Sequence, residues 1–162
     1  MAVADRGEIC QFGAKRITPR IRALEEEIEG VRQNTDIEHV HRMRVASRRL
    51  RATLPLFAGC FERREYRRWM RSIKAITRAL SAARDTDVQI EFLEVHASSH
   101  EPAAKNLQGI PFLITTLRKR RELQQADILA ALDSLEQERT LGDLASVLQN
   151  LKKKDSLSLI HI

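Results

Sequence analysis

Basic and apolar residues recur along two segments of this chain with the period of an α-helix. In each segment basic residues are spaced by three or four positions, so they fall on one helix face and apolar residues occupy the opposite face. Two consecutive amphipathic helices are therefore predicted. The first basic set is His41, Arg44, Arg48 and Arg51, and the second is Arg64, Arg67, Arg71, Lys74 and Arg78.

The composition favours one helical domain. The chain has 162 residues, enough for a single domain with a substantial core. Glycine and proline are scarce, at 6 and 4 residues, and no strand-like alternation persists. With 43% hydrophobic and 31% charged residues, the sequence is typical of a globular protein and not of a disordered one. We expect an all-α fold.

Neither a signal peptide nor a membrane-spanning stretch of roughly 18 apolar residues is recognisable in the sequence. We therefore expect a cytoplasmic protein with no membrane partner. Cys10 and Cys60 fit no metal-binding or redox spacing and are too few for a disulfide framework. Reduced thiols are the default expectation, and a single remote bridge stays open as the alternative.

The apolar spacing predicts four principal helices in an antiparallel bundle with short connections. Asp36 or Thr35 is the expected N-cap of the second helix, and Pro55 is expected to end or bend it. Residues 1–151 form one expected domain, and 152–162 an expected disordered or foreign tail. The predicted helices are 7–33, 36–55, 62–95 with a join at 83–85, and 102–137 interrupted at 109–111, followed by a short helix at 141–151.

Positive charge is concentrated in the segment 41–84. It holds thirteen arginines and lysines but only two acids, for a net charge of +11, whereas the whole chain carries +6. The rest of the chain is therefore net acidic. A helix face with one basic stripe is usually a solvated surface. Two adjacent stripes nearly free of acids instead indicate a polyanionic partner.

The kind of cation indicates which class of polyanion is the partner. Twelve of the thirteen cations are arginines, and a guanidinium forms planar bidentate hydrogen bonds with phosphate oxygens. If the two helices pack side by side, their basic faces flank one shallow channel. Nucleic acid is the alternative phosphate polymer. Tyr66 and Trp69 lie on the apolar face, so no stacking platform for single strands stands among the arginines.

Two sequence stretches resemble the landmarks of the CHAD family, the conserved histidine α-helical domain. These are HRMRVASRRLRATLPLF at 41–57 and LSAARDTDVQIEFL at 80–93. The resemblance covers about residues 7–151. It implies an all-helical domain that binds inorganic polyphosphate and associates with polyphosphate granules.

The resemblance also implies roles for particular residues. Arg84 and Asp85 are the expected Arg-Asp pair of the second landmark. From its position, Asp85 either orients Arg84 or caps the following segment. By position, the basic residues of the third predicted helix take part in binding. The signature positions are His41, Arg44, Arg48, Arg49 and Arg51, and the positional matches are Arg67, Arg71, Lys74 and Arg78.

A full family domain has two four-helix halves, and this chain carries one histidine-bearing helix. Two alternatives follow: a fragment that lacks its second half, or a half-length member that forms a homodimer to rebuild the channel. The glutamate-rich strand of triphosphate-tunnel enzymes is missing, and no acid is placed to activate His41. We therefore expect a binding protein with no catalytic residue and no cofactor.

Two weaker signals lie outside the stripes. His96 and His100 have the spacing of a zinc pair, but no third ligand is recognisable, so no metal site is expected. Arg118 and Arg121 share a predicted helix face. They either add a third wall to the channel or belong to a solvated surface.

Overall fold

The computed structural model describes residues 5–99 and 109–158, and the regular elements within these ranges are all helical. The all-α prediction is confirmed. In chain order the elements are α1 (Arg6–Glu25), α2 (Ile28–Gln33), α3 (Ile37–Thr53), the 3-10 helix η1 (Leu54–Cys60), α4 (Arg63–Ser98), α5 (Ile110–Gln137) and α6 (Thr140–Ser158).

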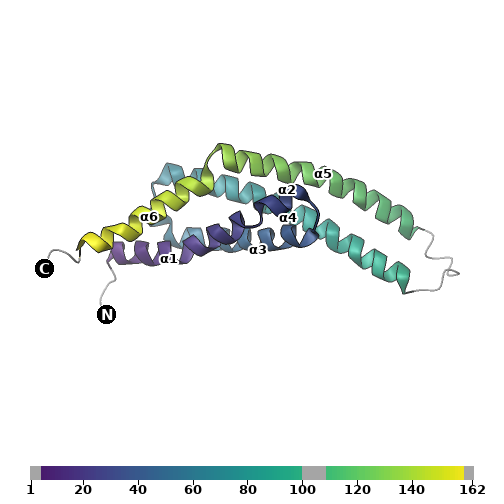
Figure 1. Ribbon diagram of the computed structural model, residues 1–162, viewed down its shortest axis with the longest axis horizontal. Helices are drawn as coiled ribbons and strands as arrows, with labels where there is room; N and C mark the ends of the chain where they lie inside the picture. The colour runs from purple at the N-terminus through teal and green to yellow at the C-terminus, as the bar shows by residue number, and fades with distance from the viewer. Residues whose placement is uncertain (1–4, 100–108, 159–162) are drawn as a thin grey trace.

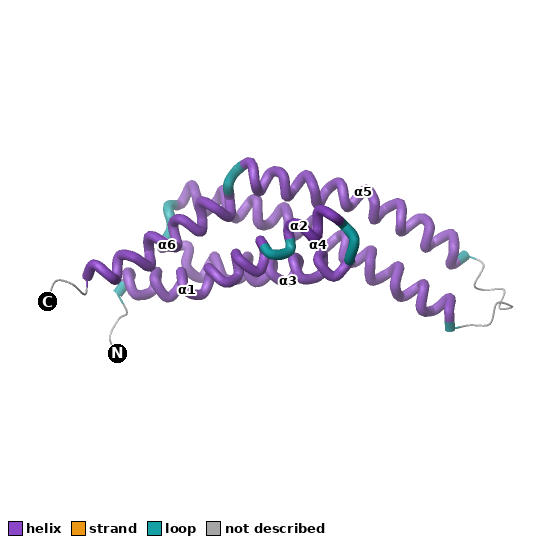
Figure 2. Tube along the Cα trace, viewed as in Figure 1, coloured by secondary structure: helices purple, strands orange, loops and turns teal. Residues whose placement is uncertain are grey.

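The helices form an elongated bundle (Figure 1). The two longest, α4 and α5, pack along each other, and one end of this pair extends past the remaining helices. α3 packs on α4, while α1 packs on both α3 and α6. The start of α1 and the end of α6 consequently lie at the same end of the molecule (Figure 2).

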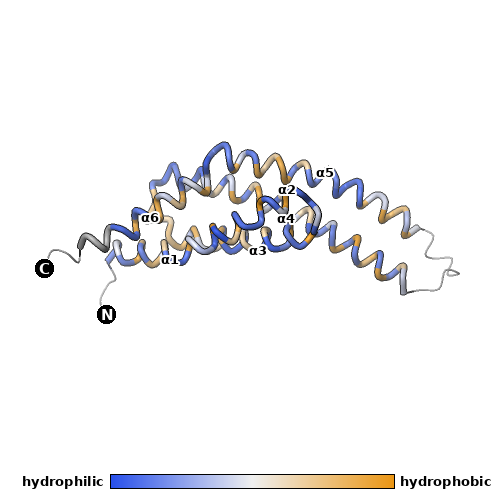
Figure 3. Tube along the Cα trace, in the orientation of Figure 1, coloured by the Kyte–Doolittle hydropathy of each residue, from blue (hydrophilic) through white to orange (hydrophobic). Residues whose placement is uncertain are grey.

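The core is built from the apolar faces that the helical spacing identified. Ile17, Met43, Leu50, Trp69 and Ile73 are essentially inaccessible to solvent. Hydrophobic and hydrophilic residues alternate along each helix accordingly (Figure 3). Burying each such side chain contributes roughly 1.5–3 kcal/mol, so these faces supply most of the drive to fold.

One expected core residue is exposed. The helical spacing of the apolar residues within 102–137 predicts Leu113 in the core, but its side chain is 49% accessible. Leu113 is in the first turn of α5. The start of this helix extends past the bundle, where α4 is its main neighbour (Figure 1). A helix that packs against one partner covers only one of its faces, so apolar spacing alone overestimates burial there.

The first predicted helix is divided in two. α1 ends at Glu25 and α2 begins at Ile28, where one helix over 7–33 was expected. The break coincides with tertiary contacts: the Glu27 carboxylate accepts a hydrogen bond from Arg42 at 2.8 Å and lies 2.7 Å from Nδ1 of His39. Local spacing cannot reveal such contacts. The predicted cap is confirmed, since the Asp36 side chain accepts from the Glu38 N–H at 2.9 Å.

Helix ends elsewhere follow the proline and polar signals in part. α3 ends at Thr53, directly before the 3-10 turn that contains Pro55. α4 is continuous through 83–85, so the join predicted there is wrong. α6 runs through Ser158, and the first seven residues of the expected tail are therefore helical. The expected helix start at Pro102 lies outside the described residues.

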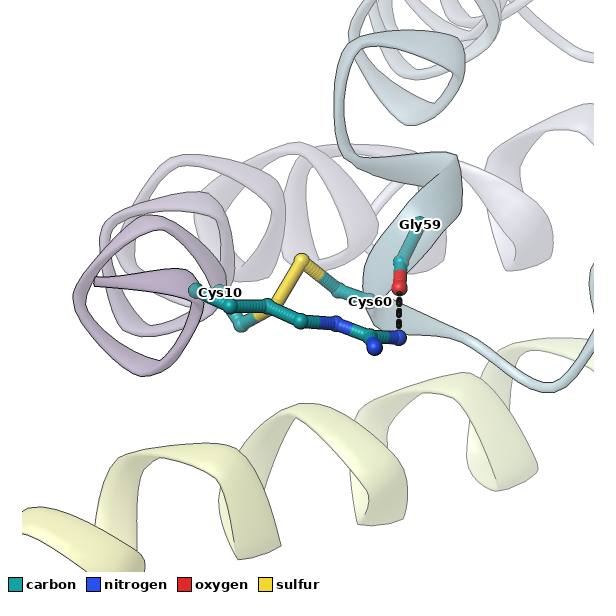
Figure 4. The surroundings of a disulfide bond; sticks show 4 residues. Cys10, Gly59 and Cys60 are labelled. Atoms are coloured by element: carbon teal, nitrogen blue, oxygen red, sulfur yellow. Dashed lines mark hydrogen bonds between the residues drawn. A yellow bond between two sulfur atoms is a disulfide. The ribbon is translucent and has the colours of Figure 1, made fainter. Parts of the chain in front are cut away.

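The two cysteines form a disulfide between α1 and η1 (Figure 4). Cys10 and Cys60 are 50 residues apart in sequence, and the default expectation of reduced thiols is wrong. An Arg6 guanidinium N–H donates to the carbonyl of the neighbouring Gly59 at 2.6 Å. The remote bridge was the alternative left open, and only the packing of α1 on η1 brings the two sulfur atoms together.

Candidate polyanion-binding surface

The first basic set lies on the outward side of α3. Arg48 and Arg51 are exposed, whereas His41 and Arg44 are half-buried at the edges of the helix face. Val40, Met43 and Leu50 point the other way into the core. The opposition of basic and apolar faces predicted from the spacing is present in the structure.

The second basic set lies along the exposed side of α4. Its first five turns alternate between outward cations and inward apolar residues such as Trp69 and Ile73. The whole set is exposed: Arg64, Arg67, Arg71, Lys74 and Arg78.

The packing of α3 on α4 brings Arg51 of the first set and Lys74 and Arg78 of the second to one depression of about 500 Å³, which we call the α3/α4 groove. Arg44 Nε donates to Ser81 Oγ at 3.3 Å across the same helix pair. Ser81 and Asp85 follow the basic set of α4 at helical spacing, so continuing the three-and-four count past Arg78 identifies both. The lining residues are Arg51, Lys74, Thr77, Arg78, Ser81, Ala82 and Asp85.

A second basic depression, of about 430 Å³, lies at the start of α4. Glu62 caps this helix by accepting from the Glu65 N–H at 2.9 Å. Backbone N–H groups of Arg64 and Glu65 hold the pKa of the Glu62 carboxyl below its ordinary value, so it stays ionised at neutral pH. The lining residues are Glu62, Arg63, Arg64, Arg67 and Arg71.

Within the described residues, the arginines that form ion pairs all lie outside the two basic sets. Among the described residues, six arginines lie within 4.0 Å of a carboxylate oxygen, and none of them belongs to the two basic sets. They are Arg32, Arg42, Arg68, Arg118, Arg121 and Arg139. The cations of the two sets form no such ion pair, and the depressions that they line hold one acid each, Asp85 and Glu62. Positive charge therefore exceeds negative charge in both, which favours an anionic ligand over the groove.

Two signature residues face a different neighbour. His41 and Arg49 line a cavity between α3 and α1, on the opposite side of α3 from the α3/α4 groove. α1 was not expected to contribute to the site, and its Arg20 is part of that cavity. The basic face of α3 is therefore shared between two depressions.

The structure does not bring Arg121 to the surface. Its Nε donates to Asp87 at 2.8 Å, and the two side chains are only 10% and 5% accessible. Burial raises the pKa of Asp87, while the charges of Arg121 and Arg84 act in the opposite direction. Arg121 thus ties α5 to α4 and forms no channel wall. Arg118 is exposed and pairs with Glu94 at 2.6 Å.

The expected orienting pair is also placed differently. Asp85 is exposed in the middle of α4, so it caps no helix. Nη1 of Arg84 is buried without a hydrogen-bond partner among the described residues. The carboxylate that holds an arginine here is Asp87, two positions later. Adjacent residues on a helix point about 100° apart, which explains why Arg84 and Asp85 do not meet.

The described ranges contain no group of three histidine, cysteine or acidic side chains arranged to hold a metal ion. His96 stacks on Phe92 with ring centroids 6.2 Å apart. His100, the other half of the rejected zinc pair, lies outside those ranges. No described helix is long and apolar enough to span a membrane.

Comparison with known proteins identifies a family for this chain. Neither the curated proteins nor the solved structures gave a match. The sequence model of the CHAD domain matches residues 15–159, which include every helix from α2 to α6 and both basic sets. Because the match covers nearly the whole chain, this protein belongs to the CHAD domain family.

Proposed function

We propose that the α3/α4 groove binds inorganic polyphosphate and that the protein catalyses no reaction on it. The observation that carries the proposal is the absence of carboxylate partners for the groove cations within the described residues, although six other arginines are ion-paired. The family membership supports a phosphate polymer as the ligand.

The shape of the basic surface supports a long ligand. The cations of α4 continue from the α3/α4 groove to the depression at the helix start, so an extended anion meets a charge at nearly every turn. Guanidinium groups suit the phosphate oxygens of such a chain. The proposed contacts are Arg44, Arg48, Arg51, Arg64, Arg67, Arg71, Lys74 and Arg78.

The groove chemistry supports binding without catalysis. In the groove, the Ser81 hydroxyl accepts a hydrogen bond from Arg44 and so joins the two helices. An arginine stays protonated and cannot accept the serine proton, so this hydroxyl is not activated as a nucleophile.

Competition between polyphosphate and nucleic acid tests the proposal. The assay measures how well unlabelled polyphosphate, duplex DNA or RNA displaces labelled long-chain polyphosphate from the protein at physiological salt. We expect polyphosphate to compete best, because the groove offers unpaired guanidinium groups and no aromatic stacking surface. Equal or stronger competition by nucleic acid would establish the alternative function instead.

Replacing Arg51, Lys74 and Arg78, the cations that line the α3/α4 groove, with alanine tests the location. If each contact contributes a slope of about 0.7 in log affinity against log salt, the triple variant lowers the slope by about 2. The same relation gives roughly a 50-fold loss of affinity at 0.15 M salt. A charge-matched control replaces the exposed Lys15, Arg22 and Lys153, and it should lose less than about threefold.

We also propose that a second copy of the chain completes the binding surface. Past Asp85 the outward side of α4 changes from basic to apolar, with Val88, Phe92 and Val95 exposed. Exposed apolar side chains next to a binding groove favour an intermolecular contact. In sedimentation velocity the wild type should form a dimer that Phe92→Asp disrupts.

A cytoplasmic, granule-associated location remains part of the proposal. Because cytosolic thiols are usually kept reduced, the Cys10–Cys60 bridge makes this location testable. Thiol trapping in intact cells reports whether Cys10 and Cys60 are bridged there. Fractionation of the same cells should recover the protein with the polyphosphate granules. Recovery only outside the cytoplasm would overturn the assignment.

A further inference from the structure

The row of outward side chains on α4 loses its positive charge at one end of the α3/α4 groove. After Arg78 the row continues through Ser81 to Asp85 and then to Val88 and Phe92, in steps of three or four residues that keep it on one helix face. Val88 and Phe92 are 47% and 68% exposed. Among the described residues that line the groove, Asp85 is the one acid. The row therefore changes from cationic to acidic and then to apolar within about three turns.

The wall that α3 contributes changes at the same level. α3 and α4 are antiparallel, because the short η1 joins them and the two helices pack along each other. The contact of 3.3 Å between Arg44 Nε and Ser81 Oγ sets their register. Two turns before Arg44, on the same face, α3 carries Ile37, which is 43% exposed and stands between the exposed acids Asp36 and Glu38. The cations on both walls of the groove therefore end at the same level.

The Asp85 carboxylate has no cationic partner of its own. The side chain is exposed, and no arginine or lysine nitrogen in the described part of the chain lies within 4.0 Å of it. The positions one helical turn away, 81, 82, 88 and 89, carry Ser, Ala, Val and Gln, so the helix offers Asp85 no ion pair. An unpaired carboxylate repels an anion that approaches it.

The opposite end of the groove is open to a long anion. From Arg78 toward the start of α4 the row is cationic at every step as far as Arg64, a span of about 21 Å at the helical rise of 1.5 Å per residue. The acid at that end, Glu62, accepts a hydrogen bond from a backbone N–H of the helix start. Its charge is partly compensated by that bond, whereas the charge of Asp85 is not. The two ends of the row therefore differ in what they present to an anion.

We infer that Asp85 is a specificity-determining residue that ends the path of a bound polyphosphate chain. The inference rests on the proposed function. The chain contacts the cations of α3 and α4 as far as the level of Ser81, and the carboxylate and the apolar side chains beyond it turn the chain away into solvent. Affinity should therefore rise with chain length until the chain spans the stretch of about 21 Å from Arg64 to Arg78, and it should change little for longer chains.

Polyphosphate chains of defined length test this limit, by isothermal titration calorimetry with the full-length protein at physiological salt. Asp85→Lys replaces the acid with a cation and extends the cationic row to 64–85, a span of about 32 Å. The chain length at which affinity levels off should therefore increase by about half. Because the variant gains one phosphate contact, it should also bind long chains about fourfold more tightly.

Glu91→Lys is the matched control, because it makes the same change of charge on the same helix. Glu91 is exposed but lies six residues from Asp85, which turns it about 120° away around the helix. This control should change long-chain affinity less than about twofold and leave the levelling-off length at the wild-type value. Circular dichroism and sedimentation velocity check that the variants keep the helix content and oligomeric state of the wild type.

Asp85→Asn removes only the charge and gives a second reading if Asp85→Lys alters the fold. It should tighten long-chain binding by about twofold. Weaker binding by Asp85→Asn would mean that the carboxylate attracts the chain, as it would through a bridging divalent cation, and would overturn the inference. An equal effect of Asp85→Lys and Glu91→Lys on the levelling-off length would overturn it as well.

Failure of the polyphosphate proposal itself would look different. In that case the wild type would bind no long chain, or its binding would survive the triple replacement of Arg51, Lys74 and Arg78. Failure of the Asp85 inference would leave long-chain binding intact and sensitive to that triple replacement.

Discussion

Reduction of the Cys10–Cys60 bridge should strongly destabilise the protein. The bridge closes a loop of about 50 residues that contains all of α2 and α3, and thus one wall of the candidate groove. Cross-linking two distant residues restricts the unfolded chain much more than the folded one. Breaking the link therefore stabilises the unfolded state.

The size of the effect follows from the loop length. For a separation of 50 residues, the chain-entropy relation gives about 14 cal/mol/K, or about 4 kcal/mol at room temperature. With an unfolding entropy of about 2.1 cal/mol/K for each of the 162 residues, this free energy corresponds to a fall of roughly 12 °C in Tm.

Urea unfolding followed by far-ultraviolet circular dichroism measures this quantity with and without a phosphine reductant. A double variant, Cys10→Ala with Cys60→Ser, is the matched control, because it contains no bond to reduce. Wild type should lose about 2–4 kcal/mol on reduction, approaching the stability of the double variant, which should not respond.

Two outcomes would refute this reasoning. Loss of less than about 1 kcal/mol from wild type would mean that the bridge does not constrain the unfolded chain as its length requires. An equal response of wild type and the double variant would show that the reductant acts elsewhere. Mass spectrometry of the oxidised protein checks that the bridge is formed at the start.

Three further predictions concern packing and pH. Asp87→Ala should cost about 3–5 kcal/mol in urea unfolding because it leaves Arg121 buried without its partner, whereas the pair replacement Asp87→Leu with Arg121→Met should recover most of that loss. Gly30→Ala should destabilise the protein by about 1–3 kcal/mol, since a Cβ there would lie 2.3 Å from the His39 ring. The control Gly59→Ala, with open space around it, should change stability little. Equal effects of the two substitutions would contradict the steric reasoning. Burial alone would raise the pKa of Glu27, but hydrogen bonds from Arg42 and His39 outweigh it and hold the pKa below its ordinary value of 4.5. The ionised Glu27 carboxylate therefore stabilises the fold above pH 4.5, and this stabilisation is lost as pH falls through the lowered pKa. The free energy of unfolding of wild type should exceed that of Glu27→Gln by about 1 kcal/mol at pH 7 and by progressively less in acid. A difference that is independent of pH would refute the pairing.

The helical faces could be predicted because they depend on spacing alone. His41, Arg44, Arg48 and Arg51 share a side of α3 for the same reason that Met43 and Leu50 share the other. The N-cap at Asp36 and the helix end before Pro55 depend on residue chemistry within one turn, and both were predictable.

The spacing of residues along the sequence did not predict contacts between residues that are distant in sequence. Arg121 looks like a surface cation until α5 packs on α4 and places Asp87 beside it. The continuity of α4 through 83–85 was missed, because the burial of Ala83 and Thr86 between neighbouring helices outweighs the polar residues there.

By itself, the sequence determined that this chain forms amphipathic helices, that its cations concentrate on two of them, and that arginine dominates. These properties arise from helical periodicity and side-chain chemistry. Only the tertiary structure decided which cations remain unpaired, that the basic face of α3 is divided between two depressions, and that Cys10 meets Cys60. The physical reason is that ion pairing, cavities and disulfides depend on the register between helices, which is set when their apolar faces pack.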